Sequence, residues 1–189
     1  MKKVFKVVVI VFVLFFAAYG VYSFTKNIIS YVSFRRQYTA IARVQNIKNG
    51  TDVFPDIKFV SPDGKTLSLY AELKKNNFVI LSFGSIYCDN CHKEYEIIQK
   101  ENILSKVPEG AELFLVVPES RDFVEQFESD MEINLPLYTV DNSVMKNLGI
   151  NKIPAHFLIG KDKKAKAYIE GFKTSVLEDM FEYIKKNEH

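Results

Sequence analysis

One long apolar segment precedes a series of shorter periodic segments along the chain. Residues 7–24 contain no charged side chain, and lysines at positions 2, 3 and 6 come before them. At about 1.5 Å of rise per helical residue, this stretch nearly crosses a hydrocarbon core of roughly 30 Å. The pattern therefore predicts a signal-anchor transmembrane helix over residues 1–24. Cleavage is the alternative, because the small residues Ala18 and Gly20 fit a signal-peptidase site.

Beyond residue 50 the periodicity predicts an alternation of strands and helices. Residues 54–70 alternate apolar and polar side chains around Pro62-Asp63-Gly64, which predicts a β-hairpin. Residues 78–83 and 112–117 are almost wholly apolar, as in strands that are buried on both faces. The other predicted elements are helices over 71–75, 88–105, 121–130 and 142–148, strands over 137–140, 155–159 and 166–171, and a closing helix that begins with the capping box Ser175-x-x-Glu178.

Charge divides the chain near residue 50. Residues 1–50 carry eight Lys and Arg and no Asp or Glu, which leaves 17 basic and 23 acidic side chains for residues 51–189 out of totals of 25 and 23. The basic residues 25–50 predict a juxtamembrane stalk, which either lies on anionic headgroups or acts as a spacer. Residues 51–189, in which acidic side chains outnumber basic ones, have the length of one compact domain, which is expected to be monomeric. This excess of negative charge gives no reason to expect nucleic acid as a partner.

The chemistry of the chain is concentrated in its only two cysteines, Cys88 and Cys91. A C-x-x-C between a predicted strand and a predicted helix indicates a thioredoxin-type redox motif. The spacing brings the two sulfurs within bonding reach, and a helix N-terminus stabilises the thiolate that attacks a disulfide. We therefore predict Cys88 as the nucleophile and Cys91 as the resolving thiol of a redox-active disulfide. A static disulfide is the alternative, and a lone C-x-x-C is a poor zinc site, so no metal is expected.

Four places in the folded part carry a resemblance to a known family. They are Phe54-Pro55-Asp56 together with residues 62–67, the run LSFGSIYCDNC over 81–91, Glu94, and residues 148–159. In this order they resemble the membrane-anchored thioredoxin-like proteins of the TlpA/ResA group of thiol-disulfide oxidoreductases. The resemblance implies an α/β thioredoxin-like fold, with a central mixed sheet flanked by helices and an extra N-terminal β-hairpin. The sequence departs from the family at Tyr87, where tryptophan is usual, and at Asp89-Asn90, where dipeptides with proline are more common.

The resemblance also assigns roles to residues around the cysteines. Glu94 matches an acidic residue of the family motif and is expected to exchange a proton with Cys91, although a surface glutamate is the alternative. Pro154 is expected to adopt the cis form beside the cysteines, which leaves the backbone of Ile153 free to pair with an extended substrate. Tyr87 is expected to form an aromatic wall for the substrate. His156 is interpreted as a structural residue.

Together these features predict a reductase outside the cytoplasm, where disulfides form and persist. The chain is expected to be a single-pass cell-membrane protein with its catalytic domain on the extracytoplasmic side. It would reduce disulfides in exported proteins, apocytochrome c among them, and would be re-reduced by a membrane thiol-disulfide electron donor without any cofactor. The alternatives are a disulfide-forming oxidase or isomerase, and a copper-binding assembly protein that uses Cys88, Cys91 and His156.

Overall fold

The computed structural model describes residues 19, 21–22, 24–26, 28–29, 32 and 44–187. The chain forms two compact units, Met1–Ala42 and Arg43–His189, and the described residues of the first unit are helical. The predicted anchor over residues 1–24 lies almost wholly outside the described residues. Within the described part of the chain, no helix combines the length and the apolar character that a membrane crossing needs. The anchor therefore stays a prediction.

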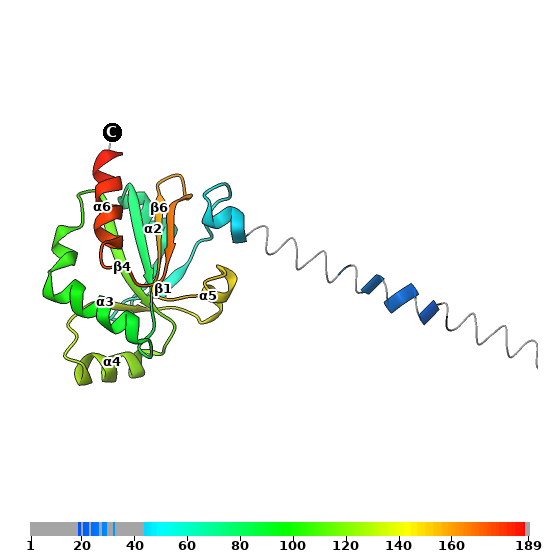
Figure 1. The fold of residues 1–189 in the computed structure, drawn as a ribbon, viewed down its shortest axis with the longest axis horizontal. Helices are drawn as coiled ribbons and strands as arrows, with labels where there is room; N and C mark the ends of the chain where they lie inside the picture. Colours follow the sequence, from blue (N-terminus) through cyan, green and yellow to red (C-terminus); the bar gives the residue numbers. More distant parts are fainter. Residues whose placement is uncertain are drawn as a thin grey trace, which may run out of the picture. The chain divides into compact units, whose positions relative to one another are not determined.

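A seven-stranded mixed sheet forms the centre of the second unit, with the strand order β2-β1-β5-β4-β3-β6-β7 (Figure 1). Strand β3 lies parallel to β4 and antiparallel to β6, and all six of its residues are buried, as the apolar run predicts. The strands are β1 (Lys58–Val60), β2 (Thr66–Ser68), β3 (Phe78–Phe83), β4 (Ala111–Val117), β5 (Leu137–Thr139), β6 (Ala155–Gly160) and β7 (Ala165–Glu170).

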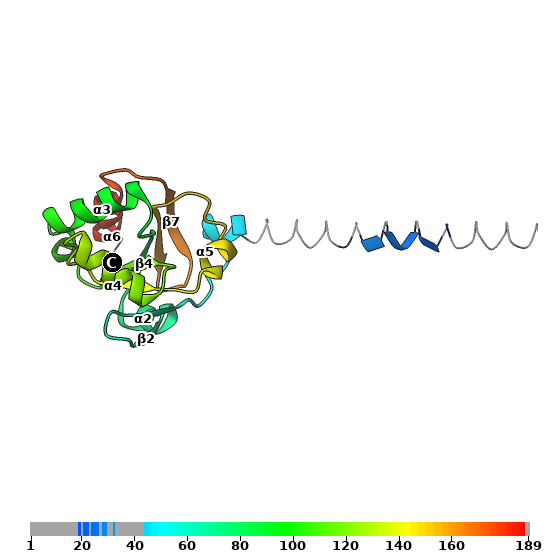
Figure 2. The same cartoon turned by 90° about the horizontal axis from the view of Figure 1, so that it is seen from below.

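Helices cover both faces of this sheet, so it separates two hydrophobic cores. The helices are α2 (Leu69–Lys75), α3 (Asp89–Lys100), α4 (Arg121–Asp130), α5 (Ser143–Asn147) and α6 (Val176–Lys186), with a 3₁₀ turn over Ile103–Lys106. Figure 2 shows α3 and α6 on one side of the sheet and α5 on the other. Ile80 of β3 packs in the core of α3, α4 and α6, whereas its neighbours Val79 and Leu81 pack in the other core, as the two-residue period of a strand requires. This architecture confirms the predicted thioredoxin-like α/β fold.

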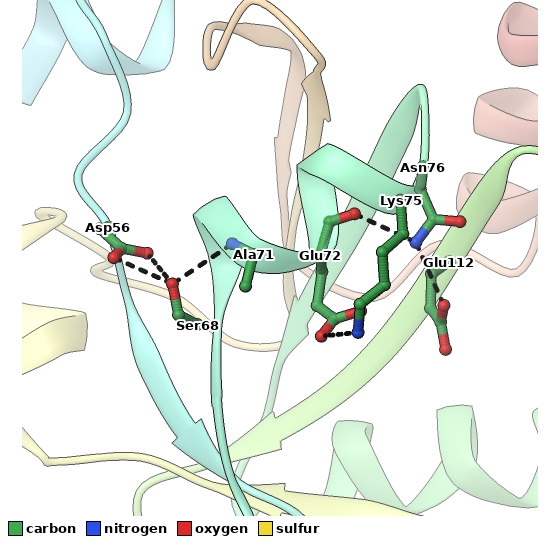
Figure 3. A network of polar contacts seen from close by, with 7 residues as sticks. All are labelled: Asp56, Ser68, Ala71, Glu72, Lys75, Asn76 and Glu112. Atoms are coloured by element: carbon green, nitrogen blue, oxygen red, sulfur yellow. Dashed lines mark hydrogen bonds and ion pairs between the residues drawn. The ribbon is translucent and has the colours of Figure 1, made fainter.

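The predicted hairpin is formed by β1 and β2, and a polar network fixes it to α2 (Figure 3). The Ser68 hydroxyl donates to Asp56 Oδ1 at 2.8 Å and accepts the backbone N–H of Ala71 at 3.4 Å, so Ser68 caps the N-terminus of α2. At the other end of α2, the side-chain amide of Asn76 donates to the Glu112 carboxylate of β4 at 3.3 Å. The extra hairpin is thereby tied to the main sheet.

The predicted end of α3 and the predicted capping box of α6 were wrong, although α6 does begin directly after Ser175. Helix α3 ends at Lys100 instead of continuing to residue 105, because Asn102 adopts a left-handed conformation with φ 50°. The capping box at the start of α6 does not form. The hydroxyl of Ser175 donates to the Asp179 carboxylate at 3.2 Å and caps no backbone N–H.

The segment before residue 51, which we predicted as the end of the stalk, packs into the second unit. Residues 44–48 are helical, and Ile47 is buried in the core on the α5 side of the sheet. The Lys48 ammonium donates to the Gly149 carbonyl at 2.5 Å and lies 3.5 Å from the Glu170 carboxylate. Val44 and Ile47 are two apolar residues in a short segment, and a pattern this short is too weak to predict the burial of Ile47 from the sequence.

Candidate active site

The two cysteines lie where the central strand β3 passes into helix α3. Cys88 is the N-cap residue of α3, and its sulfur accepts the backbone N–H of Cys91 at 3.2 Å. Cys88 is half-buried, whereas Cys91 is fully buried beneath it, and both are free thiols. The geometry therefore presents one sulfur to the surface, at the positive end of a helix dipole, and keeps the other inside.

The electrostatics of Cys91 favour the neutral thiol. Its burial raises its pKa, and the hydrogen bond with Cys88 and the charge of Glu94 raise it further. Cys91 must lose its proton before it can attack a disulfide, because the thiolate is the nucleophile. The site therefore needs a group that accepts this proton.

The segment before β6 borders the exposed sulfur. The peptide bond between Ile153 and Pro154 is cis, and the Ile153 carbonyl oxygen lies 3.9 Å from Cys88 Sγ. Tyr87 precedes Cys88 and is 72% exposed. The structure thus places Ile153 and Pro154 beside Cys88, and Tyr87 is its neighbour along the chain.

Beneath the cysteines lies a buried polar cluster of Glu94, Ser82 and His156. Glu94 points inward, and its Oε1 accepts the Ser82 hydroxyl at 3.1 Å. Nε2 of His156, which is 0% exposed, lies 3.3 Å from Glu94 Oε2. Sequence reasoning missed His156 as a neighbour of Glu94. The available signal was a histidine inside an otherwise apolar strand, AHFLIG, directly opposite Ser82 in the β3–β6 register.

Gly84 permits a close approach of α3 to the end of β3. The Tyr95 hydroxyl is buried against it, and a Cβ at residue 84 would lie 2.2 Å from that oxygen and 3.5 Å from Cys91 Cβ. Tyr95 is fully buried with its ring against Phe127, so it cannot move away freely. A side chain at residue 84 would therefore displace the helix that carries the cysteines.

We expect Gly84→Ala to lower the free energy of unfolding by about 1–3 kcal/mol, the usual cost of overpacking. Denaturant unfolding of the reduced full-length chain measures this loss. Gly160→Ala is a matched control, because the nearest atom to its Cβ, at 2.6 Å, is the flexible end of the Lys166 side chain. Equal losses in the two variants would contradict the expectation.

The described residues contain no cluster of three or more His, Cys, Asp or Glu side chains that could hold a metal ion. The two free thiols are reactive groups of this arrangement. One sulfur is accessible for attack on a disulfide. The other is placed to attack the first sulfur in turn.

Known proteins are similar to this chain in sequence or in fold. Thiol-disulfide oxidoreductase ResA from Bacillus thuringiensis subsp. konkukian (strain 97-27) is 29% identical over 138 residues, which cover 70% of this chain and 75% of that protein. The crystal structure of StoA from Bacillus subtilis matches with a TM-score of 0.55 and 22% identity, covering 69% of this chain and 97% of StoA. The pneumococcal exposed lipoprotein thioredoxin Etrx1 from Streptococcus pneumoniae strain TIGR4 matches with a TM-score of 0.57 and 18% identity, covering 68% and 99%.

A family model described as AhpC/TSA family matches residues 51–168, a segment that spans more than half of the chain and contains both cysteines. The ResA relatives agree with the enzyme class that the C-x-x-C predicts. The chain therefore belongs to the AhpC/TSA family and is a thioredoxin-like thiol-disulfide oxidoreductase of the ResA type.

Proposed function

We propose that this protein reduces disulfides in exported proteins, apocytochrome c among them, through Cys88 and Cys91. The observation that carries the proposal is the asymmetry of the two thiols. Cys88 is partly exposed at the helix N-cap beside the Ile153 carbonyl, and Cys91 is buried behind it. A nucleophile at the surface with a resolving thiol beneath it is the arrangement that dithiol-disulfide exchange requires.

The reaction proceeds in two exchanges. The Cys88 thiolate attacks one sulfur of the substrate disulfide, forming a mixed disulfide and releasing a substrate thiolate, which takes up a proton. Cys91 then loses its proton and attacks Cys88 Sγ, which breaks the mixed disulfide and releases the second substrate thiol. Two electrons have passed to the substrate, and Cys88 and Cys91 are left as a disulfide. A membrane thiol-disulfide electron donor restores the dithiol.

The other predicted residues act around these two sulfurs. The carboxyl group of Glu94 takes the proton of Cys91, which also removes the negative charge that holds this thiol neutral. The backbone of Ile153, turned by Pro154 beside Cys88, pairs with an extended segment of the substrate. The exposed ring of Tyr87 gives the substrate an apolar surface next to the reacting sulfur.

The proposed setting is the outer face of the cell membrane. Two features support this setting. The segment 7–24 carries no charge and follows three lysines. A dithiol that reduces disulfides finds its substrates outside the cytoplasm, where disulfides persist. In this arrangement residues 1–24 anchor the chain and the basic residues that follow form a short stalk. The catalytic unit faces the exported substrates.

The reduction potential of the Cys88–Cys91 pair tests the direction of electron flow. Equilibration of the full-length chain against glutathione or dithiothreitol buffers measures it. We expect a value near or below about −250 mV, in the region of thioredoxin, as a dedicated reductant requires. A value near roughly −120 mV would make the protein an oxidant and would overturn the proposal.

A further inference from the structure

His156 is a buried side chain whose two ring nitrogens lack hydrogen-bond partners among the described residues. It is completely buried in β6, and neither ring nitrogen has a hydrogen-bond partner of good geometry among the described residues. Its Nε2 nevertheless lies 3.3 Å from Glu94 Oε2. Buried polar groups in native proteins are nearly always satisfied, so a buried imidazole against a carboxyl group calls for a function.

Most of the ionisable groups around Glu94 and His156 are acids. Glu94 has only a neutral hydrogen-bond donor, Ser82, besides His156 among the described residues. An ionised carboxylate is costly to bury without a positive partner. Cys91 and Tyr95 of α3 lie close enough to Glu94 for its charge to raise the pKa of each. Cys88, which precedes α3, and Glu119, which follows β4, act on Tyr95 as well, and Lys173 and Glu178 line a small cavity together with Glu94.

Lys173 does not supply the missing positive charge to Glu94. Its ammonium lies 2.7 Å from the Asp179 carboxylate, and its side chain is more than half exposed. His156 is thus the one basic side chain within ion-pair distance of Glu94 in the described part of the chain. As an imidazolium it would balance the Glu94 carboxylate in a site from which water is largely excluded.

We propose that His156 is a positioning residue that holds Glu94 ready to accept the proton of Cys91. The inference rests on the proposed function and deepens it. Before the resolving step, Cys91 is a neutral thiol, Glu94 a carboxylate and His156 an imidazolium. The proton moves from Cys91 Sγ to Glu94, and the new thiolate is left near a positive charge in place of a negative one. The same thiolate then attacks Cys88 Sγ, and no further reactant is needed.

The cavity beside Glu94 gives its proton a way out. It measures about 20 Å³ and lies between α3 and the start of α6, where Ile97, Phe172 and Val176 line it. This volume holds about one water molecule. After resolution, the proton on Glu94 leaves to water or to the departing substrate thiolate, and the pair returns to its starting charge.

The reaction of the reduced full-length chain with the aromatic disulfide 5,5′-dithiobis(2-nitrobenzoate) separates the two exchanges. Attack by Cys88 releases the first coloured thiolate, and attack by Cys91 on the mixed disulfide releases the second. Stopped-flow absorbance then gives the rate of each phase as a function of pH. His156→Asn removes the positive charge, and Ser82→Ala is the matched control that removes a neutral hydrogen bond to the same carboxyl group.

For His156→Asn we expect the first phase to stay within about twofold, and the second to become roughly tenfold slower near neutral pH. The pH midpoint of the second phase should rise by about one unit, the size of effect that a nearby opposite charge produces. Ser82→Ala should shift this midpoint by less than half as much. Coincident pH profiles for the wild-type and His156→Asn chains would overturn the inference.

A second measurement needs no substitution and so does not depend on the folding of a variant. Two-bond ¹⁵N–¹H correlation spectra of the reduced wild-type chain report the protonation of each imidazole. We expect the buried histidine to be an imidazolium near neutral pH, and a neutral tautomer would overturn the inference. Failure of the proposed function is distinguishable, because the reduction potential of the Cys88–Cys91 pair reports the direction of electron flow, whereas the pH profile of the second phase reports the proton transfer that His156 assists.

Discussion

Replacing Cys88 with serine is expected to reduce disulfide-exchange activity to the level of buffer alone. Cys88 carries the accessible sulfur of the pair at the N-cap of α3, and a sulfur attacks a disulfide as its thiolate. A serine hydroxyl does not ionise near neutral pH and cannot form a disulfide. The rate of insulin reduction by dithiothreitol, with the full-length chain as catalyst, measures the effect.

The fold of this variant should be unaffected, because the serine hydroxyl can still accept the Cys91 N–H that the sulfur accepts at 3.2 Å. Circular dichroism and the thermal midpoint of the reduced chain provide the control. Activity that persists in a folded Cys88→Ser chain would show that Cys91 attacks first. Such a result would reverse the roles proposed for the two thiols.

Replacing Cys91 with serine is expected to trap the enzyme on its substrate. Cys88 can still form the mixed disulfide, but the buried thiol that resolves it is missing. A model protein disulfide should then remain attached at close to one molecule per chain. A shift in mobility on a non-reducing gel measures the adduct, and dithiothreitol should release it.

The double variant Cys88→Ser, Cys91→Ser is the control and should form no adduct. An adduct in the double variant would mean that the attachment is not a disulfide of these cysteines. A Cys91→Ser chain that turns over normally would show that an external thiol resolves the intermediate. Electrons would then reach the substrate without an internal disulfide.

Much of the fold was predictable because its signals are local. The apolar runs predicted both ends of β3 correctly and the ends of β4 to within one residue. The turn residues Pro62-Asp63-Gly64 correctly located the hairpin. The end of α3 was not predictable, because Asn102 adopts a left-handed conformation without a glycine or proline to mark it. Ile47 was missed for a related reason: its burial depends on partners far away in the sequence.

The residues of the site likewise fall into those that a local motif predicts and those that depend on contacts between distant segments. Cys88 and Cys91 follow from one short motif, since a helix start places both sulfurs. The contact between Glu94 and His156 depends on the antiparallel register of β3 and β6, which sets His156 opposite Ser82. The fit of Tyr95 over Gly84 likewise depends on how closely α3 approaches the sheet. Such contacts between distant segments leave no periodicity in a single sequence.

The two edges of the sheet bear on whether copies of the domain aggregate. One edge is β2, which is only three residues long, and the other is β7, which carries Lys166 and Glu170. The start of β7 is shielded by the bridge between Val53 and Lys164. Short, charged or shielded edges resist the addition of a further strand. We therefore expect neighbouring copies to remain separate even when crowded, which keeps the surface around Cys88 open to other proteins.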